Sequence, residues 1–161
     1  MAAKKSKASV AVTVLWCGLL VGTLDILAAF ANAYISFQVG PISVLKYIAS
    51  ALFGANALTG GTEMVVYGLL THYAIAYFFT ALYFFLYPRL GGASHNNILL
   101  GVMYGLFIWL LMNLVAVPLT KIPHRHMHVP QTIINIVILM VMIGVPLSII
   151  TDNFYADKTK R

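Results

Sequence analysis

Hydrophobic residues fill four long stretches of the chain, and short polar or proline-containing segments separate them. The stretches cover about residues 10–36, 64–87, 97–117 and 129–150. Each is long enough to cross a hydrocarbon core of ~30 Å, which takes about 20 helical residues at about 1.5 Å per residue. We therefore expect an all-α integral membrane protein, a four-helix bundle forming a single membrane domain over residues 1–161. Pro118 is expected to end the third span and Pro146 to kink the fourth.

A shorter apolar segment at about 42–58 lies between the first two spans and has a different pattern. It begins after Pro41, because proline fits the first turn of a new helix but not the interior of an old one. Its polar residues Ser43, Lys46 and Ser50 recur at i, i+3 and i+7. This pattern predicts a short interfacial or re-entrant helix with Lys46 and Ser50 facing water. At the other end of the chain, we expect a loose polar tail over residues 152–161.

The composition supports a membrane protein and excludes several other classes. Of the 161 residues, 61% are hydrophobic and 9% are charged, whereas about a quarter of a soluble domain is charged. The net charge of +6 does not predict a nucleic-acid partner, because the basic residues are dispersed at chain ends and in loops. Cys17 is alone, so the chain has neither a disulfide framework nor a CxxC pair. The lipid bilayer is the expected partner, and a homo-oligomer or a larger membrane complex is compatible with the pattern.

The positions of the basic residues predict the orientation in the membrane. Four spans with a cytoplasmic N-terminus place seven of the ten Lys and Arg residues inside, as the positive-inside rule prefers. The inside group is Lys4, Lys5, Lys7, Arg89, Lys158, Lys160 and Arg161, and the outside group is Lys46, Lys121 and Arg125. A fifth span at 42–58 would divide them equally. We therefore expect four spans with both termini in the cytoplasm.

Small residues at helical spacing predict the faces on which the helices pack. Gly18 and Gly22 form a GxxxG pattern in the first span, and Gly101 and Gly105 form another in the third. Such patterns let helix backbones approach closely. Gly68 begins a similar ridge in the second span. We expect all five glycines to lie in helix–helix contacts.

Asp25 is the carboxylate placed deepest in an apolar run. It follows Gly22 by three residues and Gly18 by seven, so the three share one helical face. A charged side chain at the bilayer centre costs roughly 2.5 to 3.5 kcal/mol on insertion scales, and Asp25 should therefore face protein. His72 lies on the Gly68 ridge at a matching depth of ~12 to 15 Å from the outer side. We expect Asp25 and His72 to be within hydrogen-bonding distance.

Three asparagines extend this polar group. Asn113 and Asn135 lie ~8 to 9 Å from the same side, at about 1.5 Å per residue, and Asn32 lies nearer the rim. The sequence thus predicts an outer-facing polar pocket or proton relay formed by Asp25, His72, Asn113, Asn135 and Asn32. The alternative interpretation is structural, because asparagines commonly cross-link membrane helices by hydrogen bonds.

The loop between the third and fourth spans contains His124, His126, Met127 and His128. Imidazole and thioether groups bind copper or zinc, so this loop is a candidate metal site. Solvated histidines and lipid-headgroup contacts are the alternative. Haem requires paired axial ligands, and only His72 lies inside a span. No hydrolase, metalloprotease, P-loop or dinucleotide motif is present, so we expect no enzyme and no other cofactor.

Several short motifs together resemble the YagU-like family of small bacterial inner-membrane proteins. They are Gly22-Thr-Leu-Asp25-Ile-Leu-Ala-Ala, Leu45-Lys-Tyr-Ile-Ala-Ser-Ala-Leu-Phe-Gly54 with Gly60-Gly61, Gly68-Leu-Leu-Thr-His72, and Met112-Asn113 with Val117-Pro118-Leu119. The resemblance covers most of residues 18–120. It implies a location in the bacterial inner membrane and no defined activity, because the family has no assigned mechanism.

These observations leave three functions open. The leading hypothesis is a non-enzymatic membrane protein whose outer-facing polar pocket handles a proton, an ion or a small polar solute. The second is a structural or accessory subunit that packs its glycine faces against itself or a larger complex, which would leave those faces exposed on the monomer. The third is an outer-face metal-binding protein that uses the histidines of residues 124–128.

Overall fold

The computed structural model describes residues 7–90, 96–120 and 129–159, and this part of the chain is helical with no strand. It contains four helices that are long and apolar enough to cross a membrane. They are Val10–Phe37, Thr62–Leu86, Asn97–Leu119 and Val129–Ala156. The all-α four-helix architecture predicted from the sequence is confirmed, and the four apolar helices indicate a multi-pass membrane protein.

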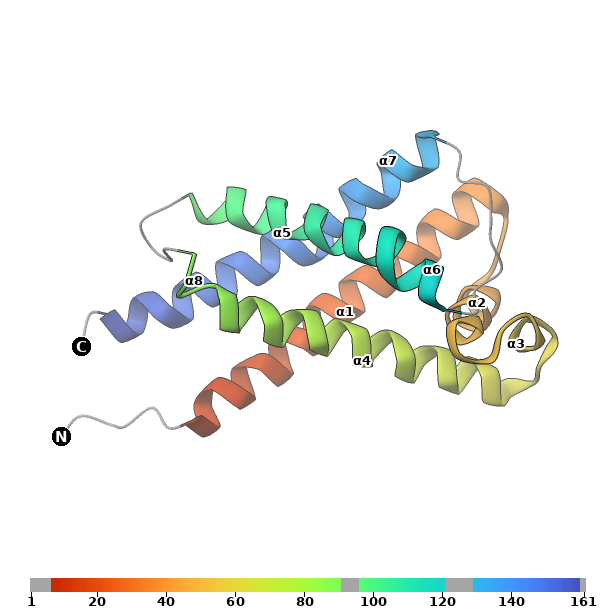
Figure 1. The fold of residues 1–161 in the computed structure, drawn as a ribbon, viewed down its shortest axis with the longest axis horizontal. Coiled ribbons are helices and arrows are strands. Elements are labelled where there is room, and N and C mark those ends of the chain that lie inside the picture. Colours follow the sequence, from red (N-terminus) through yellow and green to blue (C-terminus); the bar gives the residue numbers. More distant parts are fainter. Residues whose placement is uncertain (1–6, 91–95, 121–128, 160–161) are drawn as a thin grey trace.

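The bundle consists of two helix pairs. α1 (Lys7–Phe37) packs against α4 (Thr62–Leu86). α5 (Asn97–Leu111) packs against the last span, which is built from α7 (Val129–Ile138), the π-helical segment η3 (Leu139–Gly144) and α8 (Val145–Thr159). α1 begins and α8 ends at one end of the molecule, which we call the terminal end, and α2 lies at the opposite end, which we call the α2 end (Figure 1). Four crossings therefore return the chain to the side on which it starts.

The second helix pair is held by backbone-to-backbone contact at glycines. A methyl group on Gly101 would overlap the carbonyl oxygen of Gly144, and one on Gly144 would overlap the carbonyl oxygen of Gly101. A methyl group on Gly105 would likewise overlap the backbone of Met140. Only glycine allows these backbones to approach so closely, which explains the Gly101-x-x-x-Gly105 pattern.

The other three glycines also lie in helix contacts. Gly18 and Gly22 of α1 lie under the side chains of Tyr77 and Tyr73 of α4. A methyl group on Gly68 would overlap the backbone of Leu45. The glycine faces are thus used between helices of one molecule.

α2 (Pro41–Phe53) and the short α3 (Asn56–Thr59) cover the end of α4. With 13 residues, α2 is too short to cross a hydrocarbon core of ~30 Å. Its packing corrects one prediction, because Ser50 is 0% exposed and does not face water. Ala49 and Ser50 are buried on α2 together with Leu45, whose backbone lies against Gly68 of α4. The Ser50 hydroxyl donates to the carbonyl oxygen of Tyr47 (2.6 Å), so this buried donor is satisfied.

An apolar core of buried residues lies toward the terminal end of the bundle. Its members are Cys17, Val21, Phe79, Tyr83, Phe84, Tyr87, Tyr104, Ile108, Ile143 and Leu147. This core also explains why the prediction of a loose tail from residue 152 is wrong, since α8 continues to Thr159. The Tyr155 hydroxyl donates to the carbonyl oxygen of Phe84 (3.0 Å), and the Phe154 ring lies 5.8 Å from the Phe84 ring. Aromatic packing thus extends the helix beyond its apolar run.

Two spans widen into π-helix shortly before a proline. η2 (Met112–Ala116) precedes Pro118, and η3 precedes Pro146. Proline donates no backbone hydrogen bond, and its ring clashes with the carbonyl group four residues earlier. A π-helical turn shifts the pairing to i→i+5 and accommodates this conflict. Pro118 therefore does not end the third span, which continues through α6 (Val117–Leu119).

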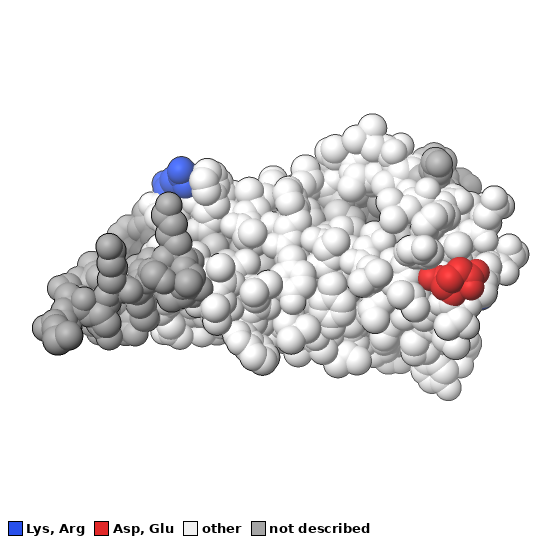
Figure 2. Space-filling model, turned by 90° about the horizontal axis from the view of Figure 1, so that it is seen from below, with Lys and Arg blue, Asp and Glu red and all other residues white. Residues whose placement is uncertain are grey.

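The surface between the two ends is apolar, as contact with lipid requires. Large exposed side chains include Leu119, Ile35 and Trp16, which are 81%, 76% and 69% exposed. On the face seen in Figure 2, basic residues lie toward the terminal end and acidic residues toward the α2 end, with uncharged residues between them.

Candidate functional site

A cavity with three polar side chains in its wall lies between the first, third and fourth spans, near the two π-helical segments. Its volume is about 190 Å³, and it is lined by Asp25, Ala29, Trp109, Asn113, Asn135, Ile138 and Leu139. Three of the five polar residues predicted from the sequence therefore surround one space. They come from three different spans, and Asn113 belongs to η2.

Asp25 supplies the only acidic side chain that lines this cavity. Within the described ranges, its carboxylate has no hydrogen bond and no ion pair. A carboxylate inside a membrane span normally pairs with a cation, a polar group or water. The carboxylate beside this cavity therefore has capacity to bind a ligand or a proton.

His72 lies near Asp25 but does not bind it directly. Its Nε2 atom donates to the carbonyl oxygen of Gly22 (2.8 Å), and its ring meets Tyr73 edge-on at 5.4 Å. The predicted hydrogen bond between Asp25 and His72 is therefore wrong, although the two groups interact electrostatically. The reason is local: Gly22 has no side chain, and its carbonyl oxygen has a second lone pair that the imidazole can reach.

Asn32 and Asn135 form a hydrogen-bonded network at the α2 end of the cavity. Asn32 Nδ2 donates to Asn135 Oδ1 (3.0 Å), and Gln131 Nε2 donates to the same oxygen (3.3 Å). Ser36 Oγ donates to Asn32 Oδ1 (3.1 Å). These bonds join α1 to α7, so Asn32 cross-links helices, as the structural interpretation of the asparagines proposed. Asn135 both cross-links the helices and lines the cavity.

Asn113 is held by its own helix. Its Nδ2 atom donates to the carbonyl oxygen of Trp109 (2.9 Å) one turn earlier. This bond orients the amide of Asn113 along the cavity wall, where η2 widens the helix.

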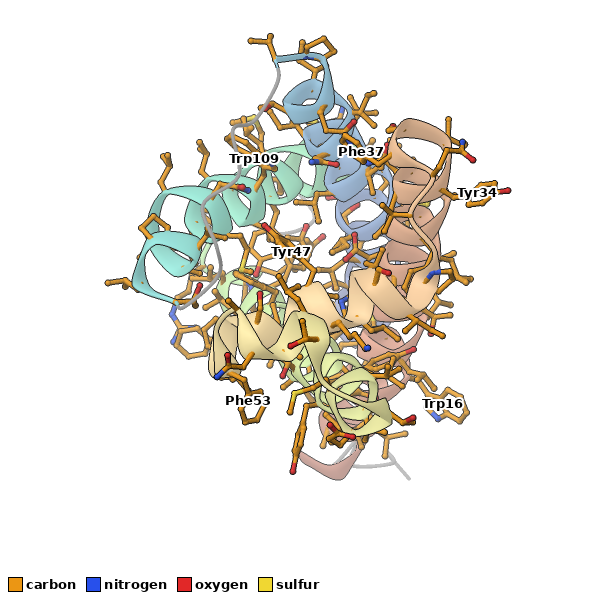
Figure 3. All side chains as sticks on the ribbon, turned by 90° about the vertical axis from the view of Figure 1, so that its right-hand side faces the viewer. Trp16, Tyr34, Phe37, Tyr47, Phe53 and Trp109 are labelled. Carbon is orange, nitrogen blue, oxygen red and sulfur yellow. The ribbon has the colours of Figure 1, made fainter. Side chains whose placement is uncertain are left out.

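Trp109 and Gln131 are members of the site that the sequence reasoning missed. Trp109 lines the cavity, whereas Trp16 and Tyr34 of α1 project outward from the bundle (Figure 3). Their spacing in the sequence could have indicated both residues. Trp109 precedes Asn113 by four residues and Gln131 precedes Asn135 by four, so each pair shares a helical face.

A larger cavity of about 440 Å³ lies beside the first half of α1. It is lined by Thr13, Trp16, Cys17, Leu19, Leu20, Thr23, Leu24 and Ile150. Its walls carry no charged side chain and are mostly apolar. It therefore offers less specific chemistry than the cavity at Asp25.

The predicted metal site at His124, His126, Met127 and His128 lies outside the described residues. Inside them, no group of three His, Cys, Asp or Glu side chains is arranged to hold a metal ion. No cofactor-binding motif was predicted from the sequence, and the cavity at Asp25 remains the candidate site.

No family model, curated protein or solved structure matches the chain. The assignment of the site therefore rests on its geometry and chemistry.

Proposed function

We propose that this multi-pass membrane protein is non-enzymatic and that its polar cavity takes up a proton or a small cation from the outer side. The observation that carries the proposal is the Asp25 carboxylate, which lines a cavity in the membrane-spanning part of the bundle without a hydrogen-bonded or ion-paired partner in the described ranges. Maintaining an ionisable group at this depth is costly, which favours a functional role over a packing role.

The other cavity residues are suited to this task. Asn113 and Asn135 bring amide groups that donate or accept hydrogen bonds without adding charge. The volume of about 190 Å³ corresponds to about six water molecules at ~30 Å³ each. A proton or a cation with part of its hydration shell therefore fits, whereas a large organic substrate does not.

The direction of access follows from the proposed orientation. In the four-span arrangement, seven of the ten Lys and Arg residues belong to segments on the side of the chain termini, and we place this side in the cytoplasm of a bacterial inner membrane, as the YagU-like resemblance implies. The Asn32–Asn135 network then lies on the outer side of Asp25. Ligands would enter from the outer side past these asparagines.

An accessory-subunit function receives less support. That hypothesis required glycine faces exposed on the monomer, but Gly18, Gly22, Gly68, Gly101 and Gly105 are buried between helices of the same chain. The metal-binding hypothesis depends on residues outside the described ranges.

A flux assay in proteoliposomes tests the proposal. The purified protein is reconstituted, a membrane potential is imposed with potassium and valinomycin, and proton entry is followed with an enclosed pH-sensitive dye. A parallel sodium gradient is followed with a sodium-sensitive dye. Asp25→Asn preserves the shape of the side chain and should lower the flux at least about tenfold, the scale of losing one charged group at a site.

Glu63→Gln is the matched control, because Glu63 is an exposed carboxylate outside the cavity whose Oε1 atom accepts from Gly61 N. It should retain wild-type flux. The proposal is wrong if the wild type behaves like empty liposomes with both ions, or if Asp25→Asn keeps full flux.

A further inference from the structure

A second group of polar side chains lies at the terminal end of the bundle, away from the cavity at Asp25. It joins three segments: Asp152 lies on α8, Tyr87 directly follows α4, and Asn97 is the first residue of α5. The Tyr87 hydroxyl lies 2.7 Å from Asp152 Oδ1 and 3.3 Å from Asn97 Oδ1. A carboxylate, a hydroxyl and an amide carbonyl thus present oxygen atoms to one small region.

Two further hydroxyls, carried by the same helices α4 and α8, are buried without a partner among the described residues. Tyr83 is 1% exposed and Thr151 is 0% exposed, and neither hydroxyl has a hydrogen bond in the described part of the chain. The Tyr83 ring lies 5.8 Å from the Tyr87 ring, and Tyr83 interacts electrostatically with Asp152. Thr151 directly precedes Asp152. Buried hydroxyls are nearly always satisfied, so these two require an explanation.

Asp152 also lacks a cationic partner in the part of the chain that the structure describes. No ion pair to it exists among the described residues. Arg89 lies just beyond Tyr87, but its guanidinium donates to the carbonyl oxygen of Phe85 (2.7 Å) and lies 3.8 Å above the Phe85 ring. This cation is therefore engaged away from the carboxylate.

We propose that Asp152, Tyr87 and Asn97, with the hydroxyls of Tyr83 and Thr151, bind an alkali-metal cation such as Na⁺. All the ligand atoms are oxygens, which hard cations prefer over softer nitrogen or sulfur ligands. One carboxylate balances a single positive charge, whereas calcium sites commonly use several carboxylates. A hydroxyl oxygen has two lone pairs to offer the ion, and the Tyr87 hydroxyl can bind it while donating its proton to Asp152 Oδ1. Asp152 is partly exposed, which gives the ion a route of entry.

The ion would explain both the unpaired carboxylate of Asp152 and the two buried hydroxyls without a hydrogen bond. It would neutralise the carboxylate and give the two buried hydroxyl oxygens a partner. It would also link α4, α5 and α8 at the terminal end. The site is separate from the cavity at Asp25 and does not depend on the function proposed for that cavity.

Thermal unfolding in lipid nanodiscs tests the site. The melting temperature is measured in NaCl and in N-methylglucamine chloride at equal ionic strength and pH. An ion that binds only the folded protein raises the melting temperature progressively with its concentration. We expect the melting temperature of the wild type to rise continuously with NaCl concentration and not to rise in the organic salt.

Tyr83→Phe is the most informative variant. It removes only an unpartnered hydroxyl, so in N-methylglucamine chloride it should be as stable as the wild type or more stable. In NaCl it should bind Na⁺ at least tenfold more weakly and lose most of the rise in melting temperature. Thr151→Val should behave in the same way, and Asp152→Asn should lose the rise completely.

Glu63→Gln serves as the control and should keep the full sodium effect, since Glu63 lies at the α2 end. The inference is overturned if the wild type shows no sodium effect, or if Tyr83→Phe and Thr151→Val both retain it. It is also overturned if Asp25→Asn abolishes the effect while the Asp152 variant keeps it. That result would place the sodium ion in the cavity at Asp25 and leave the function proposed there intact.

Discussion

Asn32 and Asn135, which are 103 residues apart in the sequence, are joined by a hydrogen bond of 3.0 Å from Asn32 Nδ2 to Asn135 Oδ1. The bond closes the bundle between its first and last spans at the α2 end of the cavity. It therefore links the first and last spans beside the cavity at Asp25.

A double-mutant cycle measures the energy of this bond. The wild type, the two single variants Asn32→Ala and Asn135→Ala, and the double variant are titrated with a denaturing detergent. Their free energies of unfolding are then compared. We expect a coupling energy of about 0.6 kcal/mol, the average for interhelical hydrogen bonds in membranes. Strictly additive effects would show that the two side chains do not stabilise each other.

The glycine contacts predict a sharp difference between two alanine substitutions. Gly101→Ala places a methyl group against the Gly144 backbone, which cannot move aside without separating α5 from η3. Overpacking of this kind costs about 1 to 3 kcal/mol or more. Gly40→Ala is the control, because no atom lies within 4 Å of its Cβ position and its φ of −78° suits any residue.

The free energy of unfolding in the same detergent titration should fall for Gly101→Ala and stay within about 0.5 kcal/mol of wild type for Gly40→Ala. Equal effects of the two substitutions would contradict the close contact between α5 and the last span.

The proposed orientation predicts side-specific chemical labelling. In a Cys17→Ala background, which removes the single native cysteine, Arg89→Cys and Leu58→Cys place thiols at exposed positions at opposite ends of the bundle. In intact bacterial cells, a membrane-impermeant maleimide should modify Leu58→Cys and leave Arg89→Cys unmodified until the cells are opened. The reverse result would invert the topology and place the Asp25 cavity closer to the cytoplasm.

The number of spans and the packing faces were predictable because they depend on strong local signals. Membrane thickness fixes the length of an apolar helix, and only glycine permits the backbone contact between Gly101 and Gly144. Depth along each helix also placed Asp25, Asn113 and Asn135 in the same half of the bundle, and they line one cavity. Depth depends only on residue count, and the sequence provides that directly.

The details that were not predictable depend on contacts between elements. Ser50 is buried together with Leu45 and Ala49 of α2, and the pattern of Ser43, Lys46 and Ser50 did not indicate this. The His72 Nε2 atom donates to the carbonyl oxygen of Gly22, which lies 2.8 Å away, and it forms no hydrogen bond with the Asp25 carboxylate. The widening before Pro118 and Pro146 had a visible signal in the prolines, but a proline alone does not indicate whether the preceding turn becomes π-helical.

The most direct test of the Asp25 cavity is to block it in a protein that is already reconstituted. Ala29→Cys, in the Cys17→Ala background, places a thiol in the cavity wall while Asp25 stays intact. Leu27→Cys is the control, because Leu27 is 56% exposed on α1 and does not line the cavity. Ion flux is measured before and after treatment with a charged, water-soluble thiol reagent on the α2 side.

We predict that the reagent modifies Ala29→Cys and lowers its flux at least about tenfold, and that it leaves Leu27→Cys unmodified and active, because charged reagents do not enter lipid. Complete modification of Ala29→Cys with unchanged flux, or no flux in either variant before treatment, would contradict the claim that the cavity at Asp25 carries the ion.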